Sequence, residues 1–250
     1  MSLTIVPSTP PEVLVHDELS RCPYLAGRVA RMPLRLPVRK LTRNELDQRL
    51  REGDRRQGFV LYRTACPRCK ACEPIRLEVS RFRPSRSQRR GFARGSRLLR
   101  VEIGPPIVDA RRVELYNAHK FGRGLGDGQP AIDGEGYRDF LVSSCCETFE
   151  LRYYLGSTLV GVAITDRGEN ALSAVYCHYD PELDALGIGA FSISKQLELC
   201  KEWGLAHLYL GLYIEESAHM VYKARYLPHE RLLGGSWVRF DRPPAAPVHV

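Results

Sequence analysis

The chain has 250 residues, of which 44% are hydrophobic and 26% are charged, and this composition excludes a disordered or fibrous protein. The formal net charge of +8 favours nucleic acid or another acidic molecule as a partner. The sequence has no apolar run of roughly 18 residues and no basic stretch followed by an apolar block near its start. We therefore expect a cytoplasmic protein with no membrane partner. In a reducing compartment its eight cysteines should be thiols or metal ligands rather than disulfides.

The first half of the chain predicts short strands and two helices. Residues 1–20 carry prolines and little periodicity, which indicates an extended arm. Residues 28–39 alternate basic and apolar side chains between prolines, a pattern that suits an edge strand. A helix is expected at residues 41–51, because Thr42 and Glu45 have the spacing of a capping box. The remaining elements of this half are strands at residues 58–62 and 75–79 and a basic helix from Ser85 onward.

A cysteine cluster lies between these two strands. Cys66, Cys69 and Cys72 are spaced C-x2-C-x2-C, so one tight turn can point several sulfurs inward, and Cys22 is available as a fourth ligand. Zinc, an iron–sulfur cluster and four free thiols all remain open.

An arginine run follows the cysteines. From Arg81 to Arg100 there are eight arginines and no carboxylate, so the run has no internal partner for its charge. The phosphates of a nucleic acid would supply that partner, and the alternative is a solvated helix face. The candidates for phosphate contact are Arg86, Arg89, Arg90, Arg94 and Arg97.

A second unit is expected after a Gly-Pro-Pro stop, which divides the chain into a Cys-rich basic unit at 1–105 and a second unit at 106–250. Its expected elements are a helix at 108–120, a glycine-rich loop at 122–136, antiparallel strands at 149–155, 158–166 and 171–177, a helix at 190–203, a strand at 206–214, a helix at 216–225 and a strand at 237–240. This order resembles that of the GNAT acyltransferases. The fold class we expect is therefore α+β, with a Cys-rich subdomain packed on a GNAT-like domain that has a mainly antiparallel sheet.

One feature argues against coenzyme A as the acyl donor. GNAT acetyltransferases usually carry a basic or amide residue three positions before a Gly-x-Gly loop that cradles the pyrophosphate. Here Gly187-Ile188-Gly189 is present, but Asp184 stands at that position and would repel a phosphate. A different acyl donor fits better.

A set of motifs spread over residues 22–237 resembles the aminoacyl-tRNA-protein transferases of the N-degron pathway, in their short bacterial form. The matching segments are Cys22-Pro23-Tyr24-Leu25 with Gly27-Arg28, then residues 66–76, 82–90, 172–176 and 179–181, Leu186-Gly187, Tyr209-Leu210-Gly211 and residues 217–225.

The resemblance implies transfer of an amino acid from a charged tRNA to the α-amine of a protein that begins with Asp or Glu, which marks that protein for degradation. No cofactor is required, and leucine is the favoured amino acid. Arginine is the alternative, because the family's Arg-His pair is reduced here to Arg123 without the histidine. A small-molecule N-acetyltransferase and a non-catalytic RNA-binding protein are further alternatives.

The candidate catalytic residues stand at the ends of expected strands. Asp180, beside His178 and Tyr179, is the expected base, although it has the alternative role of capping the Asp-Pro turn. Glu150 is a second candidate, either for holding the substrate's ammonium or for pairing with Arg152. Tyr179 is a third catalytic candidate, whereas we expect His178 to pack in the core.

The acidic side chain of the substrate requires a cation. Lys223 and Arg225 follow Tyr222 late in an expected helix, where they could face the site or interact with the helix dipole. Arg76 is a further candidate for this role, and Tyr222 is a further candidate for contact with the substrate.

Overall fold

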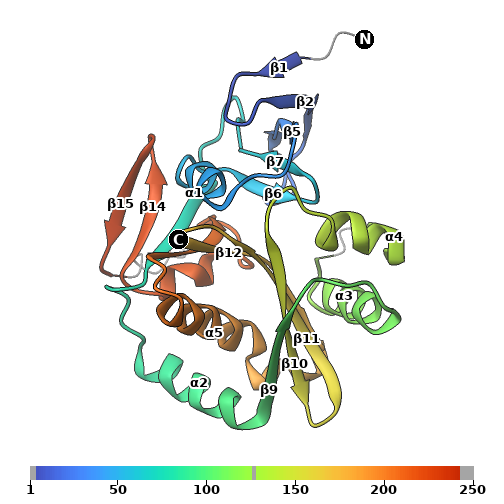
Figure 1. The fold of residues 1–250 in the computed structure, drawn as a ribbon, viewed down its shortest axis with the longest axis vertical. Helices are drawn as coiled ribbons and strands as arrows, with labels where there is room; N and C mark the ends of the chain where they lie inside the picture. The colour runs from blue at the N-terminus through green and yellow to red at the C-terminus, as the bar shows by residue number, and fades with distance from the viewer. Residues whose placement is uncertain (1–3, 126–127, 243–250) are drawn as a thin grey trace.

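A computed structural model describes residues 4–125 and 128–242. Within these residues the strands form sheets of eight and five strands and a two-stranded ribbon. The pairings are antiparallel with one exception, β12 with β13. The mixed α/β class with mainly antiparallel sheets is thus as predicted, and Figure 1 shows the smaller sheet above the larger one.

The smaller sheet is built from the start of the chain and has the order β1-β2-β5-β7-β6. Its strands are β1 (Thr4–Val6), β2 (Glu12–His16), β5 (Leu34–Pro37), β7 (Val60–Tyr62) and β6 (Arg55–Gln57); the ribbon is β3 (Leu19–Arg21) with β4 (Val29–Arg31). The prediction of an extended arm at residues 1–20 is therefore wrong for its described part, because β1 and β2 pair within the sheet and β3 pairs within the ribbon. The edge-strand prediction is also wrong, because β5 lies between β2 and β7. The prolines allow this, since Pro33 precedes β5 and Pro37 ends it.

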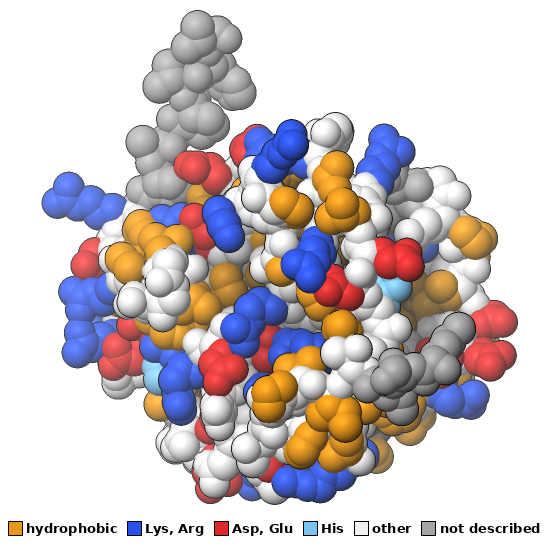
Figure 2. Space-filling model, turned by 90° about the horizontal axis from the view of Figure 1, so that it is seen from above, with side chains coloured by type: hydrophobic (Ala, Val, Ile, Leu, Met, Phe, Trp, Pro, Cys, Tyr) orange, Lys and Arg blue, Asp and Glu red, His pale blue; other side chains and the backbone are white. Residues whose placement is uncertain are grey.

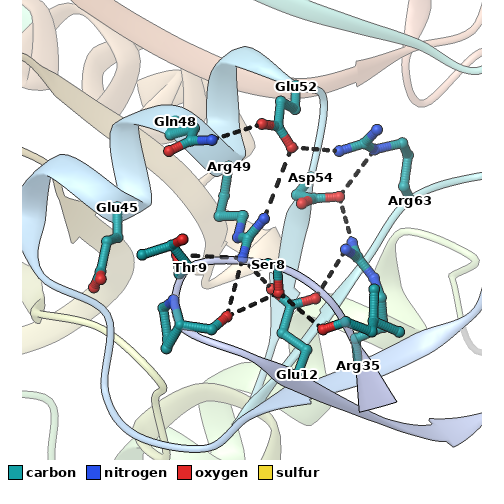
Figure 3. A network of polar contacts seen from close by, with 12 residues as sticks. Ser8, Thr9, Glu12, Arg35, Glu45, Gln48, Arg49, Glu52, Asp54 and Arg63 are labelled. Carbon is teal, nitrogen blue, oxygen red and sulfur yellow. Dashed lines mark hydrogen bonds and ion pairs between the residues drawn. The ribbon is translucent and has the colours of Figure 1, made fainter. Parts of the chain in front are cut away.

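A network of buried charges fastens this sheet to helix α1 (Arg43–Arg51), as Figure 3 shows. The carboxylate of Glu12 on β2 is fully buried and pairs with Arg49 of α1 at 2.8 Å and with Arg35 of β5 at 2.9 Å. Arg35 and Arg63 both pair with Asp54, which follows the helix. Burial raises the pKa of Glu12, while Arg35 and Arg49 lower it. These ion pairs explain why strand β2 packs against helix α1 and strand β5.

Both predicted helix starts are confirmed in the first half. Helix α1 has the full Thr42–Glu45 capping box, and helix α2 (Arg86–Leu98) has the same box between Ser85 and Gln88. Local sequence alone accounts for where these helices begin.

The larger sheet has the order β15-β14-β8-β13-β12-β11-β10-β9. Its strands are β8 (Glu73–Glu78), β9 (Leu99–Gly104), β10 (Thr148–Leu155), β11 (Thr158–Arg167), β12 (Ala171–Tyr179), β13 (His207–Tyr213), β14 (His229–Leu233) and β15 (Ser236–Phe240). The predicted β10–β11–β12 meander is confirmed. The sequence missed β9 and β14. The sheet takes β8 and β9 from the chain before residue 105 and its other strands from after it.

Helices cover both faces of this sheet (Figure 1). Helix α5 (Ile188–Glu202) packs with α2 on one face, where Phe191 stacks on Phe92 at 5.6 Å between ring centroids. Helix α3 (Ala110–Gly122), the short α4 (Gly134–Tyr137) and a π-helical turn (Arg138–Val142) cover the other. The helix predicted at 216–225 is wrong: the chain forms only a 3-10 turn, η3 (Val221–Arg225), which lets Lys223 point inward.

The central strands of the larger sheet separate, and this positions the site. The parallel strands β12 and β13 pair only at residues 171–173 with 207–209. Beyond that point β12 continues to Tyr179 and β13 to Tyr213 without pairing to each other. Parallel strands that diverge leave backbone groups free and open a space between them.

Candidate active site

A pocket of about 510 Å³ occupies the space between the diverging strands. Its walls come from Ala174–Cys177 and Tyr179 of β12, Leu210 of β13, the start of α5, the end of α3 and the segment around η3. The lining is more apolar than polar and brings together residues from five separate parts of the chain. This concave and largely apolar shape is typical of a small-molecule site.

A hydrogen-bonded trio lies at one wall of the pocket. Arg123, just after α3, donates to the hydroxyl of Tyr179 at 2.8 Å, and that hydroxyl donates to Asp184 Oδ1 at 3.1 Å. Arg123 also pairs directly with Asp184 at 3.0 Å. Burial raises the pKa of Tyr179, so its phenol stays protonated and can donate a hydrogen bond.

Two histidines stand beside this trio in different roles. His119 lines the pocket, bonds through Nδ1 to the backbone of Tyr179, and has its pKa lowered to about 4 by burial. His178 is fully buried among Tyr116, Tyr137 and Tyr176, and burial lowers its pKa to about 3. His178 therefore packs in the core, as predicted. Because burial lowers the pKa of both histidines, the rings of His119 and His178 are neutral at neutral pH.

Lys223 faces the pocket from the opposite side. Its Nζ donates to the carbonyl oxygen of Leu212 at 2.7 Å and contacts Met220 Sδ at 3.2 Å. Burial, together with the charge of Arg55, lowers the pKa of Lys223 to about 7. Arg55 on β6 is a residue that the sequence did not single out. An inward-facing arginine on a short strand has no local signal.

The other predicted catalytic residues do not line this pocket. Asp180 accepts a hydrogen bond from the backbone N–H of Glu182 at 3.1 Å and lies 3.7 Å from Arg111, so it caps the 3-10 turn η2 (Pro181–Leu186). Glu150 is fully buried on β10, where Arg112 and Arg152 each approach its carboxylate at 2.6 Å. The structure thus brings Tyr179 into the pocket but neither Asp180 nor Glu150.

The remaining predicted substrate residues are divided. Tyr222 lines the pocket. Arg76 instead pairs with Glu230 at 2.7 Å and stacks on Trp237 at 4.1 Å. The exposed Arg225 lines a second hollow, together with α2.

This second hollow, of about 360 Å³, adjoins the first one and shares Gly187, Ala190, Tyr222 and Tyr226 with it. Helix α2 forms its outer wall, and Arg94 of α2 reaches the carbonyl oxygen of Ala185 at 2.6 Å. Among the residues that the structure describes, none of the candidate arginines on α2 forms an ion pair; these are Arg86, Arg89, Arg90, Arg94 and Arg97. On the face seen in Figure 2, by contrast, basic and acidic side chains are intermingled.

The four cysteines of the cluster lie near one another beside the β3–β4 ribbon. Burial, together with the charges of Cys22, Cys66 and Cys69, raises the pKa of the Cys72 thiol to about 12. The backbone N–H of Ala71 and then Arg28, 3.3 Å away, lower the pKa of Cys69. Even so, residues 4–125 and 128–242 contain no group of three or more His, Cys, Asp or Glu side chains arranged to hold a metal ion.

Comparison with known families gives two matches along the chain. The model of the arginine-tRNA-protein transferase N terminus matches residues 20–90, and that of the arginine-tRNA-protein transferase C terminus matches residues 111–233. Together they include the cysteine cluster, the first arginines of α2 and all of the residues that line the pocket.

Relatives of similar length occur in several bacteria, and three of them share the name aspartate/glutamate leucyltransferase. The protein of Chromobacterium violaceum is 35% identical over 86% of this chain and 89% of its own. That of Halorhodospira halophila is 36% identical over 90% and 95%, and that of Thiobacillus denitrificans is 36% identical over 92% and 97%.

Among solved structures, that of L-PGS from Bacillus licheniformis has a TM-score of 0.44 and 13% identity, covering 58% of this chain and 46% of its own. Within the described residues no helix is long and apolar enough to cross a membrane.

Proposed function

This chain belongs to the arginine-tRNA-protein transferase family, and from that premise we propose that it transfers leucine from a charged tRNA to the α-amine of proteins that begin with Asp or Glu. The new N-terminal residue would mark the acceptor for degradation. Relatives at 35–36% identity over most of the chain are named for leucyl transfer to aspartate and glutamate, which supports both parts of the proposal.

The observation that carries the proposal is the composition of the pocket. Its volume of about 510 Å³ lies within the range of roughly 300–1,000 Å³ that small-ligand sites occupy, enough for an aminoacyl group and its terminal nucleoside. Among the described lining residues the one carboxylate is Asp184, which Arg123 already neutralises. An arginyl side chain would need a free carboxylate, whereas a leucyl side chain needs only apolar walls.

The architecture supports an acyltransferase of the GNAT-like type. The pocket opens where two parallel strands separate and where α5 begins after Gly187. Asp184 lines the pocket near Gly187, and a carboxylate offers no hydrogen-bond donor to the pyrophosphate of coenzyme A, which argues against a small-molecule acetyltransferase. The buried Tyr179 and the cationic side chains of Arg123 and Lys223 line this pocket. A protein that only binds RNA would not need such a pocket.

Helix α2 is suited to hold the tRNA. Its arginines have no carboxylate partner among the described residues, so phosphate oxygens are their natural ligands. The hollow beside α2 shares residues with the pocket, so an RNA end bound along the helix could pass its last nucleotide inward. We assign phosphate contacts to the arginines of α2 on this basis.

The reaction itself needs no cofactor. The amine nitrogen attacks the ester carbonyl carbon, the new C–N bond forms, the C–O bond to the ribose breaks, and the proton lost by nitrogen ends on the ribose oxygen. A free α-amine has a pKa of about 7.7–8.0, so part of it is already neutral at pH 7 and little base catalysis is needed. Orientation of the two bound reactants then supplies most of the acceleration. We assign Arg123 and Tyr179 as donors to the developing oxyanion, and Asp184, rather than Asp180, as the carboxylate that holds both donors in place before the substrate enters.

A transfer assay tests the proposal. Radiolabelled Leu-tRNA and Arg-tRNA are each supplied with peptides that begin with Asp, Glu or Ala. We expect labelling from Leu-tRNA of the Asp and Glu peptides and little labelling of the Ala peptide. Labelling from Arg-tRNA instead would overturn the choice of leucine, and absence of transfer from both donors would overturn the proposed function.

A further inference from the structure

Two buried cations flank the point where β12 and β13 separate. Arg55 and Lys223 are each less than a tenth exposed. Among residues 4–125 and 128–242 neither has a carboxylate within ion-pair distance, whereas the neighbouring buried Arg56 pairs with Asp166 at 2.8 Å. A buried cation without an anion is costly, and such a cost is ordinarily offset by a partner or a ligand.

Arg55 enters the split from the smaller sheet. One of its terminal nitrogens donates to Ser173 Oγ at 3.3 Å, and the other donates to the carbonyl oxygen of Ala174 at 3.1 Å. Ser173 is the last residue of β12 that pairs with β13, and Ala174 lines the pocket. Arg55 thus occupies the base of the split and satisfies a backbone group that β13 no longer reaches.

Lys223 reaches the same place from the other strand. Its Nζ donates to the carbonyl oxygen of Leu212 on β13. A Cβ built on Gly211 would lie 3.0 Å from Arg55 Nη2 and 3.5 Å from Lys223 Nζ, so both charged groups approach one point. Gly211 has a φ of +89°, and it stands where β13 shifts register against β8. Both cations therefore converge beside a residue that has no side chain.

The other cations near the pocket are already occupied or face elsewhere. Arg123 is held by Asp184, and Arg76 by Glu230. Arg225 lines the hollow beside α2 rather than this pocket. Lys120 is also buried, but its Nζ donates to Gln129 Oε1 and to the carbonyl oxygen of Pro130. Lys223 lines the pocket; Arg55 is not part of the lining but lies beside Lys223 at Gly211 and donates to Ala174, which does line it. Among the described residues, Arg55 and Lys223 are therefore the buried cations available to an anionic group that enters between the strands.

We propose that Arg55 and Lys223 together bind the side-chain carboxylate of the acceptor's first residue and thereby select Asp and Glu. This assignment rests on the proposed function. Arginine offers five N–H donors and lysine three, and the described residues take two of each. The remaining donors can hold a carboxylate. A neutral Asn or Gln side chain offers one acceptor oxygen and no charge, so it would bind beside the two cations much more weakly than a carboxylate.

The test compares acceptor peptides that differ only in Asp or Asn at the first position. For the wild-type protein and for Arg55→Met and Lys223→Met, kcat and KM are measured with saturating Leu-tRNA. We expect each variant to lower the ratio of kcat/KM for Asp over Asn at least tenfold, chiefly by raising KM for the Asp peptide. Matched controls are Arg239→Met and Lys201→Met, exposed positions outside the pocket, which should leave the ratio unchanged.

Two further measurements keep the outcome clear. Arg55→Lys retains the positive charge. If Arg55→Met fails to fold, Arg55→Lys serves in its place and should keep part of the preference for Asp. Binding of Leu-tRNA, measured by filter retention, should be the same for all variants. Equal losses for the Asp and Asn peptides would overturn the assignment, whereas a wild-type protein that transfers to neither peptide would instead overturn the proposed function.

Discussion

Arg123 donates a 2.8 Å hydrogen bond to the hydroxyl of Tyr179, and the same hydroxyl lies 3.1 Å from Asp184. The two residues are 56 positions apart in the chain and meet at the wall of the pocket. The arginine polarises the phenol, which makes Tyr179 a better donor to a developing negative charge.

Tyr179→Phe removes this donor while keeping the ring that packs on His119. We expect kcat for transfer to fall by roughly 10²-fold or more, since one oxyanion donor is worth about that factor. Stability should change by only about 1 kcal/mol. Single-turnover transfer from Leu-tRNA and thermal melting measure the two effects. Tyr154→Phe, which stands outside the pocket, serves as the control; similar losses in both variants would argue against the role of Tyr179.

The arginines of α2 should act through charge. Replacing Arg90 and Arg94 together by Ala should weaken tRNA binding and reduce the slope of log K against log salt by roughly 2. Recognition of the acceptor peptide should be unchanged. Arg43 and Arg239, which pair with Glu147 and Asp241, provide a double variant of the same charge as control. An unaltered salt slope would mean that α2 presents a solvated face.

Lys223→Met should raise the melting temperature while it impairs transfer. Burial lowers the pKa of Lys223 to about 7 from its ordinary value of 10.5, so between these pH values the unfolded chain binds a proton that the folded chain does not. Stability of the wild type therefore rises with pH across this window, and the cost of the buried lysine, on the order of a few kcal/mol, is largest below pH 7. The stabilisation by Lys223→Met should shrink from pH 7 to pH 10 in melting scans. A variant that is less stable at pH 7 would contradict this account.

The thiols of the cysteine cluster should differ in reactivity. Cys69 should be alkylated first in metal-free protein, because a backbone N–H and Arg28 lower its pKa, and Cys72 last, because burial raises its pKa to about 12. Mass spectrometry after timed exposure to iodoacetamide gives the order.

The zinc or iron–sulfur centre at Cys22, Cys66, Cys69 and Cys72 stays a prediction from the sequence. Elemental analysis of anaerobically purified protein tests it. A bound ion should protect all four thiols, and Cys69→Ser should release the ion and lower stability, while Cys200→Ser on α5 should do neither. Protein free of zinc and iron, with four reactive thiols, would end this prediction.

Local sequence determined the elements whose cause is local. The capping boxes at Thr42 and Ser85 start their helices through hydrogen bonds that span three residues, and the meander follows from alternating strands joined by short turns. The family motifs likewise identified the chemistry, because they are read directly from the chain. Tyr179, Tyr222 and Lys223 were singled out in this way and do line the pocket.

Only the tertiary structure decided which charged residues meet there. Arg55 reaches β12 across 118 residues of chain, and Glu12 docks the first strands by pairing with Arg49 of α1. Asp180 and Asp184 lie close together in the sequence, yet Asp180 caps the turn η2 whereas Asp184 lines the pocket. β12 and β13 stop pairing after Ser173, and the sheet opens at that point. The opening depends on packing between strands that are far apart in the sequence, which no local pattern encodes.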